Sequence, residues 1–283
     1  MTGLVLALAA AAIYGTGDFL GGVSSKRSSV WAVVVVSQSI GGAGMLAAAL
    51  LSREQFPSLQ AVGTAALGGI AGGAGVVLLY RGLALGRMSI VAPVTGAVAV
   101  VLPVLMGIVR GEHAAAAAWL GVALTACAVV LVSAGPGEHL PDGVPCAQRS
   151  RLIEAVGAGV AFGLLYVIFA RLATAPVLWA TVAARSASVP FLVLVALAAR
   201  GSLRPARASL TTIAWAGICD AAANVFYLLA LRHTLLAFAA VITSLYPAST
   251  VLLARVVLRE RLVRVQWVGV ALALAGIVLI AAG

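Results

Sequence analysis

The chain ends with RERLVRVQWVGVALALAGIVLIAAG, residues 259–283, and an earlier stretch, residues 111–135, reads GEHAAAAAWLGVALTACAVVLVSAG. Aligned without gaps, the two stretches share a glutamate, a Trp-x-Gly and a closing Ala-Gly at an offset of 148 residues (260 − 112). The same offset recurs near the start of each half. The matching pairs are Glu112 and Glu260, Trp119 and Trp267, Gly121 and Gly269, Gly15 and Gly163, and Trp31 and Trp179. A period this long predicts an internal duplication of a whole domain and not a solenoid of short repeats.

The composition predicts a membrane protein. The chain is 63% hydrophobic and only 9% charged, with a mean hydropathy of +1.14. Soluble domains carry about 25% charged residues, so this chain has too little polar surface to be covered by water. Apolar runs of about 20 residues are long enough to cross a hydrocarbon core about 30 Å thick as helices. We therefore expect an all-α integral membrane protein with several transmembrane helices, located in the cell membrane.

Ten apolar runs are expected to form these helices, five in each half of the chain. The runs cover residues 4–22, 30–51, 61–80, 88–109 and 114–134, and then 152–170, 177–199, 210–231, 235–258 and 262–282. This divides the chain into a first repeat (1–135), a hydrophilic linker with three prolines (136–151) and a second repeat (152–283). Because five is odd, the copies would cross the membrane in opposite directions. Secondary transporters built from such inverted repeats bind their substrate where the repeats meet.

The net charge of +10 does not predict nucleic-acid binding. Most arginines fall at the ends of the apolar runs, where basic residues set the orientation of membrane proteins, and Lys26 is the only lysine. The odd-numbered loops carry most of the basic residues, so the positive-inside rule predicts that both termini lie outside the cytoplasm. The expected partners are the lipid bilayer and a small molecule.

Signatures of enzymes and cofactors are missing from the sequence. There is no G-x-x-x-x-G-K-[ST] phosphate loop, so the chain has no motif for ATP-driven pumping. The three cysteines and three histidines are scattered, without the spacing of a metal site or a disulfide framework. They are Cys127, Cys146, Cys219, His113, His139 and His233. We expect no cofactor, no metal and no enzymatic activity.

One apolar run carries a stripe of polar residues. Asp220 lies near the middle of the run 210–231, and Asn224 and Tyr227 follow at i+4 and i+7, which places all three on one helix face. A charged residue at the centre of a membrane helix costs about 2.5–3.5 kcal/mol on insertion scales, so such residues usually face a cavity or a partner. The stripe therefore predicts a substrate cavity, and the alternative is a hydrogen-bonded clamp between helices.

Arg185 is a further candidate for the same site. Arg185 lies well inside the run 177–199, and the first repeat has Ser37 at the equivalent place, followed by Gln38. Its alternative role is to reach the membrane interface as a helix-end arginine. Consecutive helices are commonly antiparallel neighbours, so Arg185 and Asp220 are predicted to pair directly or to face one polar cavity with Asn224 and Tyr227.

Asp18 lies in the first run, about a turn before its end. It is either a structural anchor or a site that carries a proton.

Backbone features point to close packing and to kinks. The run 61–80 contains Gly68-x-x-x-Gly72 and Gly69-x-x-x-Gly73, which predict close helix packing. Four prolines within three of the runs can kink their helices because proline lacks a backbone N–H. These are Pro93, Pro103, Pro190 and Pro247. The glutamates Glu112 and Glu260 fall in tight turns, where either a capping role or simple solvation is expected.

The motifs together resemble those of the drug/metabolite transporter superfamily, EamA type. The chain shows a short loop with a glutamate before Trp-x-Gly in each half, and Tyr14-Gly15-x-x-x-Phe19 followed by Lys26. Other elements of the resemblance are Leu83-Ala84-Leu85, Leu229-Ala230-Leu231 and Leu245-Tyr246-Pro247; the first repeat departs from the last, with Ala99 in place of the proline. The resemblance implies ten helices, a central cavity, export of amino acids or related small metabolites, and cytoplasmic termini. The arginine distribution predicts the opposite orientation.

Two other functions fit the sequence less well. Proton-coupled efflux of lipophilic cations would need a membrane carboxylate, for which Asp18 or Asp220 could serve. A membrane enzyme or assembly factor without transport would need a nucleophile, an acid/base pair or a metal site, and the sequence shows none of these.

Overall fold

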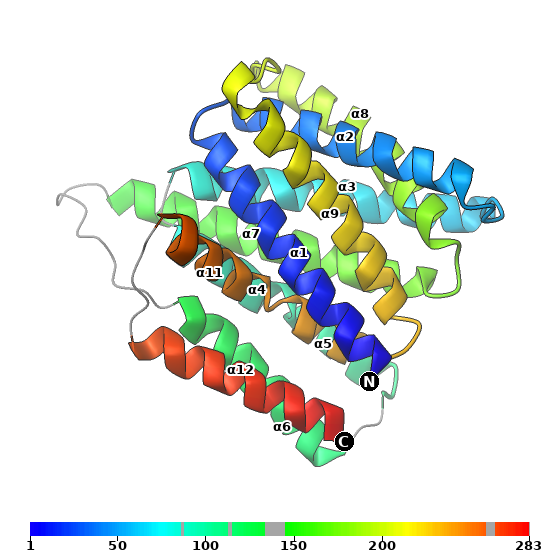
Figure 1. Ribbon diagram of the computed structural model, residues 1–283, viewed down its shortest axis with the longest axis vertical. Helices are drawn as coiled ribbons and strands as arrows, with labels where there is room; N and C mark the ends of the chain where they lie inside the picture. The colour runs from blue at the N-terminus through cyan, green and yellow to red at the C-terminus, as the bar shows by residue number, and fades with distance from the viewer. Residues whose placement is uncertain (86–87, 113–114, 134–144, 259–263, 283) are drawn as a thin grey trace.

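The computed structural model describes residues 1–85, 88–112, 115–133, 145–258 and 264–282, and the regular structure in these ranges is helical. The helices are α1 (Thr2–Ser25), α2 (Val30–Leu51), α3 (Leu59–Leu85), α4 (Met88–Ala99), α5 (Val101–Val109), α6 (Ala116–Ser133), α7 (Pro145–Phe169), α8 (Val177–Ala198), α9 (Leu210–Ala230), α10 (Leu236–Thr243), α11 (Tyr246–Leu258) and α12 (Arg264–Ala282), with short 3₁₀ turns at Ala170–Leu172 and Arg207–Ser209. Figure 1 shows them as one bundle of roughly parallel and antiparallel rods.

Six of these helices are long and apolar enough to cross a membrane, judged by length and composition. They are α1, α2, α3, α7, α8 and α9. Shorter apolar helices lie in the segments Val94–Val109, Trp119–Ala128 and Leu236–Thr250. The structure therefore shows a helical bundle with several spans, while the number ten remains a prediction.

Two of the predicted helices are interrupted. The run 88–109 forms α4 and α5, which part at Val100, and the run 235–258 forms α10 and α11, which part at Ser244 and Leu245. Pro103 and Pro247 lie just beyond these breaks. Proline cannot donate to the carbonyl four residues earlier, and its ring collides with that carbonyl. Each half of the chain thus contains one broken helix, at a comparable place in its fourth run.

The first helix of the second half begins earlier than predicted. Helix α7 begins at Pro145, inside the predicted linker and before the predicted start at Leu152. Proline is favoured in the first turn of a helix, where its missing N–H has no partner to lose. The rest of the linker, residues 136–144, lies outside the described residues.

Glu112 has the predicted capping role, but it caps a helix far away in the sequence. Its carboxylate accepts hydrogen bonds from the backbone N–H groups of Leu236 (2.9 Å) and Ala237 (3.2 Å), at the start of α10. The first N–H groups of a helix lack partners within it, and a negative charge there is favourable. The loop that follows α5 in the first half therefore caps the start of α10 in the second half. Glu260 lies outside the described residues.

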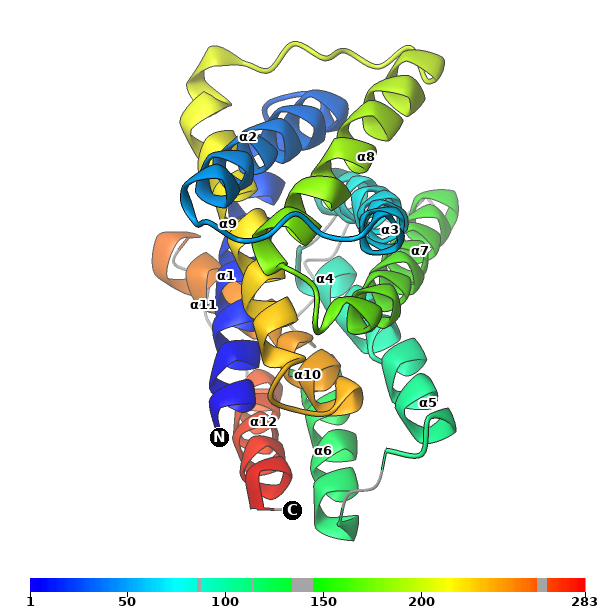
Figure 2. The same ribbon diagram turned by 90° about the vertical axis from the view of Figure 1, so that its right-hand side faces the viewer.

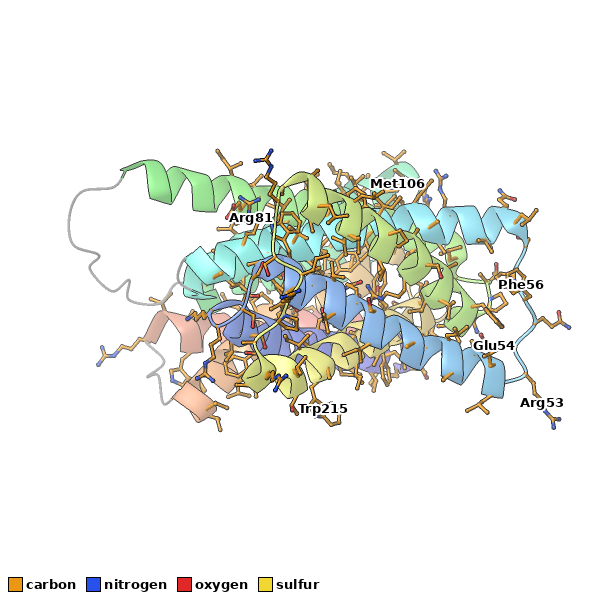
Figure 3. All side chains as sticks on the ribbon, turned by 90° about the horizontal axis from the view of Figure 1, so that it is seen from above. Arg53, Glu54, Phe56, Arg81, Met106 and Trp215 are labelled. Carbon is orange, nitrogen blue, oxygen red and sulfur yellow. The ribbon has the colours of Figure 1, made fainter. Side chains whose placement is uncertain are left out.

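Both termini lie at the same end of the bundle (Figures 1 and 2). The α2–α3 loop, with Arg53, Glu54 and Phe56, is found at one end of the helices, and Arg81 lies toward the other (Figure 3). Trp215 is 57% exposed and points away from the bundle (Figure 3). An exposed apolar side chain of this kind suits a helix surface in contact with lipid.

The helix contacts follow a simple exchange between the two halves. Helix α1 packs on α9 as α3 packs on α7, and α2 packs on α9 as α3 packs on α8. Likewise α1 packs on α10 as α7 packs on α4, and α1 packs on α11 as α7 packs on α5. The counterparts at the repeat offset are α1 and α7, α2 and α8, α3 and α9, α4 and α10, and α5 and α11. When both helices of a contact are replaced by their counterparts, the result is the other contact of the same pair. This exchange is the pattern expected if a two-fold axis relates the halves.

Glycines set the closest of these contacts. A Cβ on Gly69 of α3 would collide with the carbonyl of Ala184 in α8, and a Cβ on Gly217 of α9 would collide with the carbonyl of Ser37 in α2. Gly69 and Gly217 are 148 residues apart, which is the offset of the repeat (217 − 69). The close packing predicted for the glycines of α3 is therefore found at Gly69, and its counterpart holds α9 against α2.

We expect Gly217→Ala to lower the free energy of unfolding by about 1–3 kcal/mol, the usual cost of adding a methyl group where there is no room. The matched control is Gly44→Ala in α2, where a new Cβ meets nothing within 4 Å and helix propensity favours alanine by up to about 1 kcal/mol. Thermal unfolding of the purified variants in detergent measures the difference. Equal midpoints for the two variants would contradict the close contact.

Candidate functional site

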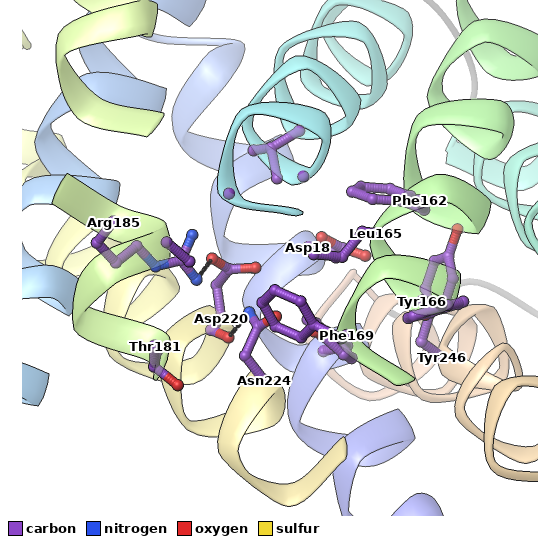
Figure 4. Close-up of a pocket in the computed structure, with 15 residues that line it drawn as sticks. Asp18, Phe162, Leu165, Tyr166, Phe169, Thr181, Arg185, Asp220, Asn224 and Tyr246 are labelled. Carbon is purple, nitrogen blue, oxygen red and sulfur yellow. Dashed lines mark hydrogen bonds and ion pairs between the residues drawn. The ribbon is translucent and has the colours of Figure 1, made fainter. Parts of the chain in front are cut away.

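A cavity lies at the centre of the bundle, between α1, α3, α7, α8, α9 and α11 (Figure 4). Its polar wall consists of Asp18, Thr181, Arg185, Asp220 and Asn224, and its aromatic wall consists of Tyr14, Phe162, Tyr166, Phe169 and Tyr246. Its volume, measured to the centres of water molecules, is about 30 Å³, which is room for about two waters. A larger solute can enter only if side chains or helices move apart.

The polar wall is organised by one ion pair. The Arg185 guanidinium on α8 donates to Asp220 Oδ2 on α9, and the two side chains are 8% and 16% exposed. Gln38 on α2 closes a ring with this pair, since it accepts from Arg185 through Oε1 and donates from Nε2 to Asp220 Oδ2 at 2.9 Å. The direct pairing of Arg185 with Asp220, predicted from the sequence, is therefore present.

The local sequence around the ion pair gives it room and support. Gly42 on α2 lies against Arg185, where a Cβ would come within 3.1 Å of the arginine Cβ. Ser188, one turn along α8 from Arg185, donates to the Gln38 Oε1 at 3.5 Å. Asn224 donates from its side-chain amide to the backbone carbonyl of Asp220 at 2.8 Å, and its side chain lines the cavity beside the ion pair (Figure 4).

Asp18 enters the cavity from α1. Its neighbour Gly17 allows α1 to approach α9 closely, because a Cβ there would lie 3.1 Å from the Cys219 Cβ and 3.5 Å from the Asp220 backbone nitrogen. The aspartate is only 8% exposed. Within the described parts of the chain, its carboxylate has no hydrogen-bond donor and no salt bridge. The site thus brings together Asp18, Arg185, Asp220 and Asn224.

Tyr227 is the predicted site residue that the cavity leaves out. It is fully buried, its hydroxyl donates to the Tyr166 carbonyl at 3.3 Å, and the two rings lie 4.6 Å apart. It shares a helix face with Asp220, but seven residues at 1.5 Å each place it about 10 Å further along the helix axis. Tyr227 therefore packs against Tyr166, which lines the cavity, without lining the cavity itself.

Sequence reasoning missed several residues of the site. Gln38 was noted only as the neighbour of Ser37, although an amide inside the apolar run VVVVSQSI is a signal that could have found it. The chain has five tyrosines, and all five are buried in or around the cavity. Tyr14, Tyr166 and Tyr246 line it, while Tyr80 donates to the Gly17 carbonyl at 3.4 Å and Tyr227 lies behind Tyr166.

Several pairs of equivalent positions in the two halves line the cavity together. Four pairs of lining residues are separated by the repeat offset of 148: Tyr14 and Phe162, Asp18 and Tyr166, Gly72 and Asp220, and Val76 and Asn224. These four pairs account for eight of the fifteen lining residues. The charges are distributed unequally, because the counterparts of the charged residues Asp18 and Asp220 are uncharged.

Groups suited to metal binding are missing from the described residues, where no cluster of three or more His, Cys, Asp or Glu side chains occurs. The polar wall offers two carboxylates, one guanidinium, one amide and one hydroxyl, which suit hydrogen bonding and ion pairing with an organic solute.

Comparison with known proteins identifies the family. The family model of the EamA-like transporter family matches residues 1–134 and 150–282, the two halves of the chain. A solved crystal structure of a protein superposes with a TM-score of 0.74 at 19% identity, covering 96% of this chain and 98% of that one, which shows a shared fold. A search of curated proteins gave no match.

The chain belongs to the EamA-like transporter family and is a multi-pass membrane transporter of the drug/metabolite type. The resemblance noted in the sequence is thereby confirmed.

We expect Arg185→Ala and Asp220→Ala each to lower the free energy of unfolding by about 3–5 kcal/mol, because each leaves its partner as an uncompensated buried charge. The double variant should lose much less than the sum of the two, since it removes both charges. Unfolding of the four proteins in one detergent measures the coupling. Additive losses would contradict direct pairing.

Proposed function

We propose that this protein is a secondary transporter that exports small organic metabolites, amino acids or related compounds, by alternating access around the central cavity. The observation that carries the proposal is the position of the cavity, which is lined by residues of both halves, eight of them in four pairs of equivalent positions. In transporters built from inverted repeats, the substrate binds at this interface and the halves rock around it.

The proposed architecture has ten membrane crossings in two inverted repeats. It adds to the six long helices the crossings α4–α5, α6, α10–α11 and α12. The exchange of helix contacts between the halves supports it, and so does the presence of one broken helix in each half. Broken helices at corresponding places are typical of transporters, because the free helix ends can bind polar substrate groups.

The chemistry of the cavity suits a solute that carries both charges. The Arg185 Nε and the Tyr14 hydroxyl are buried without a hydrogen-bond partner among the described residues, so a carboxylate of the solute could accept from them. Tyr246, the first residue of α11, also lines the cavity, and the start of a helix favours a negative group. Asp18 offers a free carboxylate to an ammonium group.

The experiment that tests the proposal is transport by purified protein in proteoliposomes loaded with a mixture of amino acids and amines, with efflux followed by mass spectrometry. We expect the wild-type protein and Gly44→Ala to release at least one solute against empty liposomes. The double variant Arg185→Ala/Asp220→Ala should retain most of its stability but transport at least tenfold more slowly.

Two results would contradict the proposal. Release from wild-type liposomes equal to that from empty ones would remove the transport function for the solutes tested. Unchanged transport by the double variant would show that the route does not pass through the cavity.

A further inference from the structure

The two carboxylates of the cavity have different surroundings. Asp220 receives hydrogen bonds from Arg185 and from Gln38 on the same oxygen, Oδ2, and both donors are held in place by each other. Asp18 is also largely removed from water, at 8% exposure, and has no donor among the described residues. The Asp220 carboxylate is therefore engaged by side chains of the protein, whereas the Asp18 carboxylate is available to a ligand.

The charges on the cavity wall do not balance. The lining residues include two carboxylates, Asp18 and Asp220, and a single cation, Arg185. A second positive charge is needed to neutralise Asp18, because an uncompensated charge inside a membrane bundle is strongly unfavourable. A proton or a cationic group can supply it.

The groups packed around Asp18 do not supply this charge. Helix α9 presents Asp220 and Cys219, and the other titratable neighbours are Tyr80 on α3, Tyr166 on α7 and Tyr246 on α11. Helices α2 and α10, which also contact α1, contain no titratable residue. Arg185, the cation of the wall, is bound to Asp220 and Gln38.

Aromatic rings complete the surroundings of Asp18 with groups that favour a cation. Tyr14, Phe162 and Tyr166 line the same cavity (Figure 4). The face of an aromatic ring attracts an organic cation when the cation lies within about 6 Å of the ring centre, and such rings recognise ammonium groups. A free carboxylate among rings is a site for an ammonium group attached to an apolar body.

We propose that Asp18 binds in turn a proton and the ammonium group of the transported solute, while Asp220 remains paired with Arg185. In the step, the O–H bond of the protonated Asp18 carboxyl breaks, the proton passes to water at the open end of the cavity, and the carboxylate forms an ion pair with the incoming ammonium. Inward movement of one proton would thus drive outward movement of one solute. This inference rests on the proposed function, because it assigns the coupling group of the same cavity.

The test compares three probes that share a phenyl ring and differ in charge: phenyltrimethylammonium, L-phenylalanine and benzenesulfonate. Binding to detergent-solubilised wild-type protein is measured by calorimetry in buffers of different ionisation enthalpy, which gives the number of protons released. We expect the first two probes to release about one proton each and to bind about tenfold more weakly for each unit by which the pH is lowered. Benzenesulfonate should not bind competitively with them.

The variants separate the two carboxylates. Asp18→Asn should bind the cationic probe at least tenfold more weakly, without proton release and without pH dependence. Asp18→Glu, which keeps the charge, should restore proton release. Should Asp18→Asn fail to fold, infrared spectroscopy of the wild-type protein provides a second measurement, since the carbonyl stretch of a protonated carboxyl should disappear when phenyltrimethylammonium binds.

Several outcomes would overturn the proposal. They are binding of the cationic probe without proton release, proton release that survives in Asp18→Asn, tighter binding of benzenesulfonate than of the cation, and no binding of any probe. If solutes cross the membrane in the proteoliposome assay while proton release is absent, the proposed function stands and only the role of Asp18 falls. If no solute crosses, the function itself falls.

Discussion

The ion pair between Arg185 and Asp220 is the interaction on which the rest of this site depends. Neither charge is tolerable alone among apolar helices, and together they must lie at the same depth on neighbouring helices. This requirement fixes α8 and α9 relative to each other, and Gln38 extends it to α2 through hydrogen bonds to both partners. Helices held together only by apolar contacts can shift along one another. Here the hydrogen bonds and the ion pair among Gln38, Arg185 and Asp220 fix the positions of α2, α8 and α9 along their axes.

Glycines make this ring possible by bringing backbones close together. Gly217 places α9 against the Ser37 carbonyl of α2, one residue from Gln38, and Gly17 places α1 against α9 beside Asp220. Without a hydrophobic driving force between helices in lipid, close van der Waals packing is a main source of association. The same glycines therefore stabilise the bundle and set the distances between the charged groups of the cavity.

Much of the fold could be predicted from the sequence because membrane helices follow from composition and a duplication follows from a constant offset. The pairing of Arg185 with Asp220 could also be predicted, since a charge at mid-helix needs a partner. The breaks could not be located, because a proline only permits a kink: Pro190 leaves α8 continuous, whereas Pro103 and Pro247 lie beside interruptions. The helix period placed Tyr227 on the correct face, but depth along the helix decides whether a residue reaches the cavity. Tyr14 and Tyr246 stood out only within motifs of the family resemblance, and Tyr166 gave no signal, because aromatic residues are ordinary members of apolar runs.

Duplication gave the two halves equivalent helices, and later substitutions gave these helices different side chains at the cavity. Gly72 and Val76 of α3 occupy the positions that Asp220 and Asn224 occupy in α9, so α9 carries polar groups where α3 carries none. In the proposed alternating-access cycle, the same cavity would open toward either end of the bundle. The most direct measurement is hydrogen–deuterium exchange of the backbone at the two ends, the α2–α3 loop (residues 52–58) and the α8–α9 loop (residues 199–206), before and after a transported solute is added. Alternating access predicts that exchange slows in one loop and rises in the other. Exchange that changes in the same direction at both ends, or at neither, would contradict it.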